Sequence, residues 1–397
     1  MSEGPLRIAL VSETYPPDVN GVAMTLGRMV DGLWRRGHSI FLVRPRQHPD
    51  EVPQHGKGLR EFLVAGIPIP RYEGLRFGLP ARAALIAEWQ RERPDIVHVV
   101  TEGPLGWSAV SAARALRLPV SSGFHTNFDA YSRHYGLGWL KGIIARYLRR
   151  LHNRTDATLV PTHGIARHLS MSGYRNLTVV SRGVDTVLFN PNRRSSALRQ
   201  QWGVGDDALV VCHVGRLAPE KNLGLVLEAF RAIVRGRRDA RLVFVGEGPL
   251  RKSLMREHPE HVFAGLRRGE DLAAHYASAD LFLFPSLTET FGNVTAEALA
   301  SGLAVVAYDH AAAAELIEPR TNGILASPGD EEAFINAALL LATRPEELRR
   351  VRTQAAASVA HLDWERIHDR VVRTLRERIA AHRRRIGAED ALISVLD

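Results

Sequence analysis

The chain has 397 residues, 45% hydrophobic and 24% charged, which is the composition of a globular protein with two ordinary domains and argues against disorder. The single cysteine, Cys212, excludes an internal disulfide framework and any multi-cysteine metal site, and its apolar neighbours predict a buried position. The net charge of +9 lies in the first 185 residues, which carry 24 Lys and Arg against 15 Asp and Glu. This asymmetry predicts an anionic neighbour for the N-terminal half: a membrane, a nucleic acid or a phosphorylated substrate.

No apolar run approaches the roughly 20 residues that cross a bilayer. The first apolar segment, Leu6–Val11, is too short for the core of a signal peptide and is closely followed by Glu13. The sequence therefore predicts a cytoplasmic protein.

In the first half, short apolar segments alternate with longer amphipathic ones. Helical periodicity runs through Gly21–Arg36 and stops before Gly37. Strands are predicted at Arg7–Ser12, Ser39–Val43, Asp95–Val100, Pro119–Phe124, Ala157–Pro161 and Leu177–Ser181. This alternation predicts a parallel sheet covered by helices.

The same alternation begins again after Thr186–Asp206, which we interpret as a linker, and the chain closes with a charged amphipathic helix at Asp363–Arg385. Strands of this half are predicted at Leu209–Val214, Ala240–Val245, Val262–Ala264, Leu281–Pro285 and Ala304–Ala307. The predicted fold class is α/β, with two Rossmann-like doubly wound domains facing across a cleft. They span residues 1–185 and 186–362, and residues 363–397 form a helix that returns to the first domain. Ligands are expected at the carboxyl ends of the strands.

Several nucleotide-binding and metal motifs are missing from this α/β pattern. The first strand runs into Glu13–Gly21, which holds one glycine instead of the G-x-G-x-x-G that binds a dinucleotide. Gly246-Glu247-Gly248 follows another strand but does not complete that motif, so it predicts a turn. The sequence has no Walker A, H-E-x-x-H or D-x-D motif. It therefore predicts an activity that needs no metal and no cofactor.

Glycine and charged residues follow the predicted strands of the second half. Gly215-Arg216 and Lys221 combine a glycine, which permits close approach of a ligand to the backbone, with two cations. His275–Asp280 leads into a strand that ends at Pro285-Ser286. The next segment, Glu289–Ala298, places two glutamates eight residues apart around a Phe-Gly pair.

With these segments the chain resembles glycosyltransferase family 4. The resemblance rests on the pattern P-S-x-x-E-x-F-G-x-x-x-x-E-A-x-A-x-G from Pro285 to Gly302, together with the Gly215, Arg216 and Lys221 block, and it extends from Glu13 through the closing helix. It implies the two-domain GT-B fold and a retaining hexosyltransferase. The donor, GDP-mannose or a UDP-sugar, would bind the second domain and the acceptor the first. A polysaccharide-directed transferase and a nucleotide-sugar epimerase of the same fold remain alternatives.

The resemblance implies a role for each residue of the donor site. Arg216 and Lys221 would stabilise the leaving diphosphate, because negative charge grows on its oxygens as the glycosidic bond breaks. Glu289 would contact the sugar hydroxyls and support positive charge near the anomeric carbon, while Glu297 would accept hydrogen bonds from the ribose. The other expected donor contacts are Gly21, Gly215, Gly246, Leu266, Arg267, Phe291, Gly292, Asn293 and Val294, the last three opening a helix whose N–H groups suit phosphate.

The position of a histidine relative to a predicted strand indicates whether it faces the cleft or the core. His125, directly after a predicted strand, matches the family's active-site histidine and joins Glu289, Arg216 and Lys221 as a catalytic candidate. Asp129, close by in sequence, is a candidate acceptor contact. His98 lies within an apolar run, and we interpret it as a core or cleft-wall residue.

A basic amphipathic helix is predicted within Arg133–Arg154, with an apolar stripe at Leu140, Ile144, Tyr147/Leu148 and Leu151. Two interpretations stay open: an interfacial helix on an anionic bilayer, or a helix packed on its own sheet with a solvated basic face. The membrane or acceptor candidates are Trp139, Lys141, Arg146, Arg149 and Arg150.

The resemblance to lipid-directed mannosyl- and glycosyltransferases favours a lipid or glycolipid acceptor. It predicts a peripheral location on the inner face of the cytoplasmic membrane. A nucleic-acid-binding protein would not need the motif that contains Glu289 and Glu297, so no nucleic-acid partner is expected.

Overall fold

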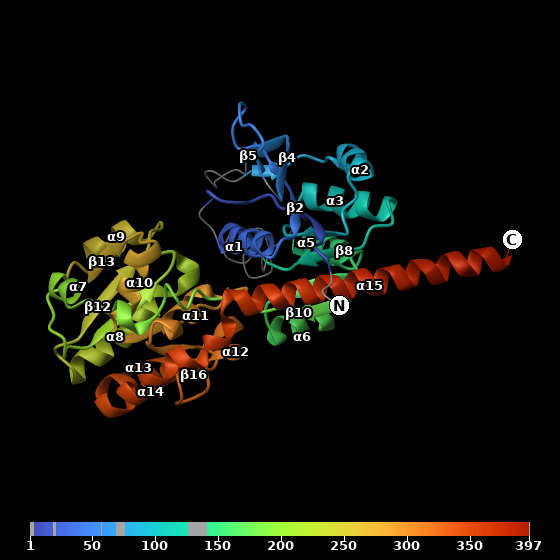
Figure 1. The fold of residues 1–397 in the computed structure, drawn as a ribbon. Helices are drawn as coiled ribbons and strands as arrows, with labels where there is room; N and C mark the ends of the chain where they lie inside the picture. The colour runs from blue at the N-terminus through green and yellow to red at the C-terminus, as the bar shows by residue number, and fades with distance from the viewer. Residues whose placement is uncertain (1–3, 19–20, 57, 69–75, 126–140, 397) are drawn as a thin grey trace. The chain divides into compact units, whose positions relative to one another are not determined.

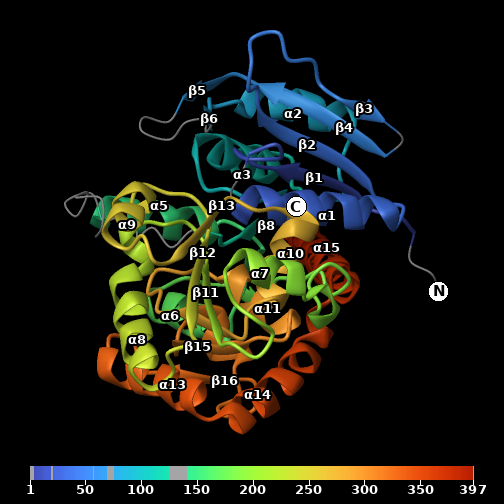
Figure 2. The ribbon, with the colours of Figure 1, turned by 90° about the vertical axis from the view of Figure 1, so that its left-hand side faces the viewer.

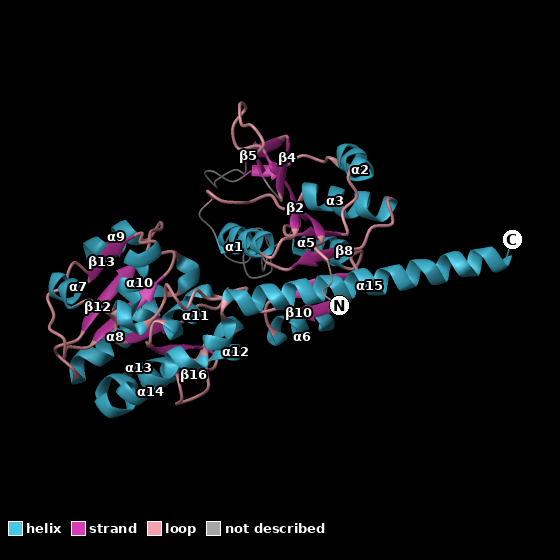
Figure 3. Cartoon of the chain, in the orientation of Figure 1, coloured by secondary structure: helices cyan, strands magenta, loops and turns pink. Residues whose placement is uncertain are grey.

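The computed structural model describes residues 4–18, 21–56, 58–68, 76–125 and 141–396, with the backbone alone for Lys141 and residues 392–396. The chain divides into two compact units. Unit 1 contains the described residues from 4 to 181 together with 364–396, and unit 2 contains residues 182–363. Strands and helices alternate in both units (Figure 3).

Unit 1 is built on an eight-stranded sheet in the order β10-β9-β8-β7-β1-β2-β4-β3, in which every described pairing except that of β3 with β4 is parallel. A separate antiparallel hairpin pairs β5 with β6. The strands are β1 (Arg7–Val11), β2 (Ser39–Pro45), β3 (His55–Gly56), β4 (Leu59–Val64), β5 (Gly66–Pro68), β6 (Arg76–Gly78), β7 (Ile96–Val99), β8 (Val120–Gly123), β9 (Ala157–Val160) and β10 (Leu177–Val179).

The helices of unit 1 include the long last helix of the chain, α15, which runs beside α1 (Figure 1). Gly32 of α1 makes this packing possible, because a Cβ there would lie 2.0 Å from the ring of His368. Arg36 adds ion pairs to Glu365 and Asp369 at 2.8 and 2.9 Å. The helices are α1 (Gly21–Arg35), α2 (Arg82–Arg91), α3 (Pro104–Ala115), α5 (Lys141–His152), α6 (His163–Met171) and α15 (Trp364–Leu396).

Unit 2 is a six-stranded sheet in the order β13-β12-β11-β14-β15-β16, parallel throughout its described pairings. Counted from β11, the spatial order is 3-2-1-4-5-6, which is that of a doubly wound nucleotide-binding sheet. The strands are β11 (Val210–Val214), β12 (Arg241–Val245), β13 (Val262–Gly265), β14 (Leu281–Phe284), β15 (Ala304–Tyr308) and β16 (Gly323–Ala326).

Helices lie on both faces of this sheet (Figure 2). On one face α8 and α13 pack together in the main hydrophobic core, and α10 and α11 cover the other. The helices are η2 (Pro191–Arg193), α7 (Ser196–Gln201), η3 (Pro219–Lys221), α8 (Leu223–Gly236), α9 (Arg251–Glu257), α10 (Gly269–Ala277), α11 (Asn293–Ala300), α12 (Ala311–Leu316), α13 (Glu331–Thr343), α14 (Pro345–Ser358) and η4 (Ala360–Leu362). In the part of the chain that the structure describes, no helix is both long enough and apolar enough to cross a bilayer.

Every strand predicted from sequence is present with ends shifted by two residues at most, and Cys212 is buried as expected. The prediction missed β4, β16 and the short strands β3, β5 and β6. In β4 the apolar pattern is broken by Arg60 and Glu61. Glu61 is nevertheless buried, because it accepts hydrogen bonds from Arg44 of β2 at 3.0 and 3.2 Å. A charge buried by pairing leaves no apolar periodicity to detect.

The segment Thr186–Asp206, interpreted above as a linker, is instead a packed part of unit 2. It contains α7, from which the wholly buried Arg199 donates to the backbone carbonyls of Ser278 and Ala208 at 2.8 and 2.6 Å. Within this segment, Asn190 and Pro191, residue types common in linkers and turns, form the start of η2. Turn-forming residues predict an interruption between strands, which is present here, but they do not predict whether the segment between the strands is buried.

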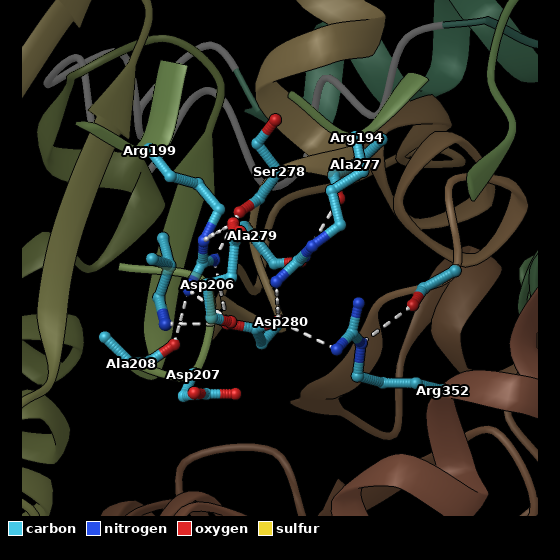
Figure 4. A network of polar contacts seen from close by, with 12 residues as sticks. Arg194, Arg199, Asp206, Asp207, Ala208, Ala277, Ser278, Ala279, Asp280 and Arg352 are labelled. Atoms are coloured by element: carbon cyan, nitrogen blue, oxygen red, sulfur yellow. Dashed lines mark hydrogen bonds and ion pairs between the residues drawn. The ribbon is translucent and has the colours of Figure 1, made fainter. Parts of the chain in front are cut away.

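Asp280, just before β14, collects three arginines around one buried carboxylate (Figure 4). Its Oδ1 accepts from Arg194 and Arg352 at 3.0 and 2.8 Å, and its Oδ2 lies 3.2 Å from Arg199. The same Oδ2 accepts from the backbone N–H of Val210 at 2.8 Å. This network joins the segment before α7, α7 itself, β11, β14 and α14.

Candidate donor site

The sheet of unit 2 changes winding direction between β11 and β14, and the loops after these strands carry the predicted donor residues. Gly215 and Arg216 follow β11, while Ser286 and Glu289 lie after β14. Ligands of doubly wound sheets bind at such a switch point, outside the carboxyl ends of the strands. The structure therefore gathers these sequence-predicted residues where a nucleotide is expected.

Two glycines bring the loops after β11 and β12 into contact. Gly215 and Gly246 have φ angles of +150° and +137°, which favour glycine. A Cβ on Gly246 would lie 2.0 Å from the carbonyl oxygen of Gly215, and the N–H of Gly215 donates to Val245 at 3.0 Å. Gly246 thus bends the chain after β12, as predicted. Because it has no side chain, its backbone lies directly against that of Gly215.

Lys221 and Glu289 form an ion pair in which the lysine Nζ donates to Glu289 Oε1. Ser286 donates to the same oxygen at 2.8 Å, and the Lys221 ammonium lies 5.6 Å from the centre of the Phe284 ring. Burial acts to raise the pKa of the Glu289 carboxyl, but Lys221, Ser286 and His310 together hold it below its ordinary value. Glu289 is therefore an ionised carboxylate, and it does not cap the following helix, whose N-cap is Gly292.

Arg216 is more exposed than Lys221, with 46% of its side chain accessible. Its guanidinium lies 3.5 Å from the carboxylate of Glu220, one turn further along the loop. The two predicted diphosphate cations thus lie on one loop, Lys221 beside Glu289 and Arg216 at the surface.

The N-terminus of α11 opens next to this pair. Gly292 has a φ of +88°, and the following N–H groups of Asn293 and Val294 belong to the first turn, which has no acceptor within the helix. Asn293 Oδ1 is buried without a hydrogen-bond partner among the described residues. The turn thus combines donors suited to an anion with one buried acceptor.

Glu297 lies one turn into α11, where it accepts a hydrogen bond from Tyr276 at 3.0 Å. Burial and the nearby Glu297 charge raise the pKa of Tyr276 well above its ordinary value, so the phenol remains a donor. The hydroxyl thus holds one carboxylate oxygen of Glu297 in place.

The predicted base-contacting loop follows β13. Gly265 has a φ of +75° and accepts from the N–H of Gly246 at 2.9 Å, and Leu266 is half exposed. The Arg267 guanidinium turns back to Ala264 and Asp271 at 2.9 and 3.1 Å. The loop is thus tied to the Gly246 turn and presents its backbone and Leu266 to solvent.

Gly21 and His125 belong to unit 1. Gly21 is the exposed first residue of α1, with open space where a Cβ would stand. His125 follows β8, and its ring folds back over Gly123, whose Cβ position lies 2.3 Å from Nε2. Asp129 and Trp139 lie outside the described residues. His98 is a core residue, as one interpretation expected, and contacts Ser121 at 2.9 Å while burial lowers its pKa to about 4.

The apolar stripe of α5 faces the interior of unit 1. Leu148 and Leu151 are buried in its hydrophobic clusters, with Ile144 and Tyr147 packed against them. Tyr147 also donates to the carbonyl oxygen of Glu102 at 2.8 Å. The described part of the stripe therefore packs on the sheet, as one of the two interpretations expects, while Leu140 lies outside the described residues. Contact of the basic face with a bilayer stays a prediction. The exposed basic candidates on this helix are Arg146, Arg149 and Arg150.

Three further residues near the site were not singled out from the sequence. Arg182 is buried with its guanidinium 5.9 Å from the Phe291 ring, and burial lowers its pKa to about 10 against the opposing effect of Glu289. His213 is wholly buried below Gly215 and donates through Nδ1 to Leu283. Arg182 directly follows the predicted strand Leu177–Ser181, so the rule that selected His125 would have found it. His310 is separated from the predicted strand Ala304–Ala307 by two residues, and His213 lies inside an apolar run, so neither gave this signal.

One group of side chains in the described chain has the spacing of metal ligands, namely His258, Glu260 and His261. It precedes β13, at the opposite edge of the sheet from the carboxyl ends of the strands. It therefore does not belong to the donor site, and transfer without a metal or cofactor stays a prediction.

Ala311, which follows β15 and begins α12, has a φ of +53° that suits glycine better than alanine. We expect Ala311→Gly to raise the free energy of unfolding by about 1 kcal/mol, because the strain of a left-handed alanine is removed. Ala312→Gly is the matched control and should lower stability by a similar amount, since Ala312 is buried inside the helix. Urea unfolding followed by circular dichroism measures both; equal losses in the two variants would show that Ala311 is unstrained.

Glu13, after β1, is a buried carboxyl that accepts from the N–H of Leu105 at 3.1 Å. Burial raises its pKa to about 7, with a smaller contribution from Glu102. Because the folded-state pKa is raised, the stability contributed by the protonated form is complete below the ordinary value of 4.5 and is lost as pH rises through about 7.

We therefore expect Glu13→Gln to match the wild type near pH 5 and to exceed its free energy of unfolding by up to about 3 kcal/mol near pH 8. Urea midpoints across this range give the comparison. The exposed Glu228→Gln should leave the pH dependence unchanged. A Glu13→Gln profile parallel to that of the wild type would contradict the raised pKa.

The comparisons with known proteins agree with this geometry. Residues 19–188 match the family described as Glycosyltransferase Family 4, and residues 208–344 match Glycosyl transferases group 1. A GDP-mannose-dependent alpha-mannosyltransferase of Mycolicibacterium smegmatis is 34% identical, covering 92% of this chain and 96% of the relative. A GDP-mannose-dependent alpha-(1-6)-phosphatidylinositol dimannoside mannosyltransferase of Mycobacterium tuberculosis is 28% identical, covering 93% and 96%.

Among solved structures, sucrose-phosphate synthase from Thermosynechococcus elongatus matches with a TM-score of 0.77 and 20% identity, covering 95% of this chain and all of that one. This likeness confirms the predicted GT-B fold class. The chain belongs to glycosyltransferase family 4 and is a hexosyltransferase.

Proposed function

We propose that this protein transfers mannose from GDP-mannose to a lipid-linked acceptor with retention of anomeric configuration. The observation that carries the proposal is the 34% identity to a GDP-mannose-dependent alpha-mannosyltransferase over nearly the full length of both chains. The grouping of Lys221, Glu289 and the α11 N-terminus at the switch point of unit 2 supports it.

The residues of unit 2 suit a diphosphate leaving group. Arg216, Lys221 and the first N–H groups of α11 would neutralise the charge that grows on the phosphate oxygens. Glu297, held by Tyr276, would accept hydrogen bonds from the ribose hydroxyls. The backbone of the Leu266 loop would contact the base.

The Lys221–Glu289 pair suggests how the donor engages the site. A diphosphate near Gly215 would draw the ammonium toward its own charge and leave Glu289 for the sugar hydroxyls. The acceptor hydroxyl then attacks the anomeric carbon on the face that the leaving group departs from. The bond to phosphate breaks, the bond to the acceptor oxygen forms, and the acceptor proton moves to a phosphate oxygen. A covalent enzyme intermediate is the competing route.

Thermal-shift measurements with GDP-mannose, GDP, UDP-glucose and UDP test the donor, followed by turnover with lipid extracts and assignment of the product's anomeric configuration by NMR. GDP-mannose should give the largest shift and an α-mannosyl lipid. A thermal shift with UDP-sugars alone would show that the donor is a UDP-sugar and not GDP-mannose. A soluble polysaccharide product would show that the acceptor is not lipid-linked. Conversion of the donor without any acceptor would indicate an epimerase.

Transfer is expected to persist after exhaustive treatment with EDTA, because two side-chain cations and a helix N-terminus supply the positive charge that a metal would otherwise bring. Initial rates before and after chelation, with and without added Mg²⁺, are the measurement. Activity that is lost with EDTA and restored by Mg²⁺ would contradict this prediction.

A further inference from the structure

Two arginines of unit 1 lie against one tryptophan where α3 meets the end of α5, and a third arginine contacts the backbone of one of them. The guanidinium carbons of Arg150 and Arg154 lie 6.0 and 5.4 Å from the ring centre of Trp107 on α3. Arg114, also on α3, donates to the carbonyl oxygen of Arg154 at 3.2 Å. We call these four residues the α3–α5 arginine cluster.

The cluster carries positive charge that no carboxylate balances within the described part of the chain. None of its arginines has an ion pair there, whereas Arg36 and Arg44 of the same unit each contact two carboxylates. The Arg154 Nε is buried without a hydrogen-bond partner among described residues. Burial and the charges of Arg114 and Arg150 lower the pKa of Arg154.

Like charges held this closely repel each other, and each cation–π contact with the half-buried Trp107 indole returns only about 1 kcal/mol. The scaffold that holds them is nevertheless rigid. Trp107 stacks on Tyr147 with ring centres 5.4 Å apart, and the Tyr147 hydroxyl is fixed to the backbone at Glu102. Cations that repel each other but are held in a fixed arrangement favour the binding of an anion that neutralises them.

Guanidinium groups present planar forks of donors that match the oxygens of a phosphate, and several converging forks bind it better than lysines would. We propose that the α3–α5 arginine cluster binds the phosphate of an anionic lipid headgroup. The inference rests on the cluster itself and not on the donor assignment, and of its members only Arg150 was selected from the sequence. It places membrane contact at the α3–α5 surface, without insertion of the apolar stripe of α5.

The test compares Arg114→Gln/Arg154→Gln with Arg82→Gln/Arg167→Gln, a pair of exposed arginines of unit 1 whose loss changes the net charge equally. Full-length proteins are floated at low salt with phosphatidylglycerol–phosphatidylcholine vesicles and with phosphatidylcholine alone. We expect partitioning of the cluster variant onto the anionic vesicles to fall about thirtyfold, roughly fivefold per cation, and that of the control to fall much less. Equal losses in both variants, or no wild-type binding, would overturn the proposal.

Melting temperatures separate a binding role from a structural one and identify the source of the phosphate. Without phosphate at low salt, the cluster variant should melt at or above the wild type, because repulsion is relieved. A melting temperature well below that of the control variant would overturn the proposal. Inorganic phosphate could stabilise the wild type but not the cluster variant, while the cluster variant keeps full vesicle binding. That result would assign the site to soluble phosphate. Loss of duplex DNA binding without loss of vesicle binding would assign it to nucleic acid, and either result overturns the lipid assignment.

Discussion

Lys221→Ala is expected to reduce kcat by about a hundred- to a thousandfold while the protein stays folded, which is the usual effect of removing one group that stabilises the developing charge. Lys221 lies at the switch point of unit 2 and contacts Glu289. Its loss would therefore remove the proposed diphosphate cation and the partner of the proposed sugar-contacting carboxylate together. Lys252→Ala, on the exposed side of α9, is the matched control and should keep wild-type turnover.

Glu297→Ala should also remove most activity, but through the donor nucleoside. Its loss would weaken binding of the free nucleotide, which a thermal shift with GDP reports separately from turnover. Circular dichroism and melting temperature confirm that each variant is folded. Near-normal turnover in either Lys221→Ala or Glu297→Ala would refute the donor-site assignment.

Asp280→Ala is expected to lower the free energy of unfolding of unit 2 by about 3–5 kcal/mol, because it strands a wholly buried Arg199 without its counter-ion. Three arginines and one backbone N–H depend on this carboxylate (Figure 4). Asp206→Asn provides the control. Its carboxylate lies 3.8 Å from Arg199 but is 65% exposed, and such pairs contribute about 0–1 kcal/mol.

Urea unfolding and limited proteolysis measure the difference between the Asp280 and Asp206 variants. If Asp280→Ala does not fold, Asp280→Asn, which keeps one acceptor oxygen, and Arg352→Gln, which removes a partly exposed partner, provide graded losses. Destabilisation no greater than that of Asp206→Asn in all of these variants would show that the network does not hold unit 2 together.

Much of the scaffold was accessible from local patterns. Parallel strands buried on both faces read as short apolar runs, so β1, β11 and β14 were found within a residue of their ends. Two of the exceptions share one cause, a charged side chain that is buried because a distant partner compensates its charge. Glu61 of β4 is buried against Arg44, and Arg199 of the expected linker is buried against Asp280.

The sequence of α5 showed an apolar stripe and a basic face but not their surroundings. Its period of 3.6 residues is a property of the helix alone, and a stripe of this kind can cover a sheet or enter a lipid surface. Only the tertiary structure shows that Leu148 and Leu151 of this stripe pack inside unit 1. The α3–α5 arginine cluster, in which Arg150 and Arg154 lie against Trp107 and Arg114 contacts the Arg154 backbone, has no counterpart in any local pattern.

The sequence by itself determined the family and the two alternating α/β halves, because these depend on short-range periodicity and on a motif contained within residues 285–302. The same motif predicts the donor-site residues of the second half. The tertiary structure alone decided which charges meet. Lys221 pairs with Glu289 across 68 residues, and Arg199 pairs with Asp280 across 81. Such partners are selected by the strand order of the sheet, which brings the ends of β11 and β14 together, and no local pattern records that order.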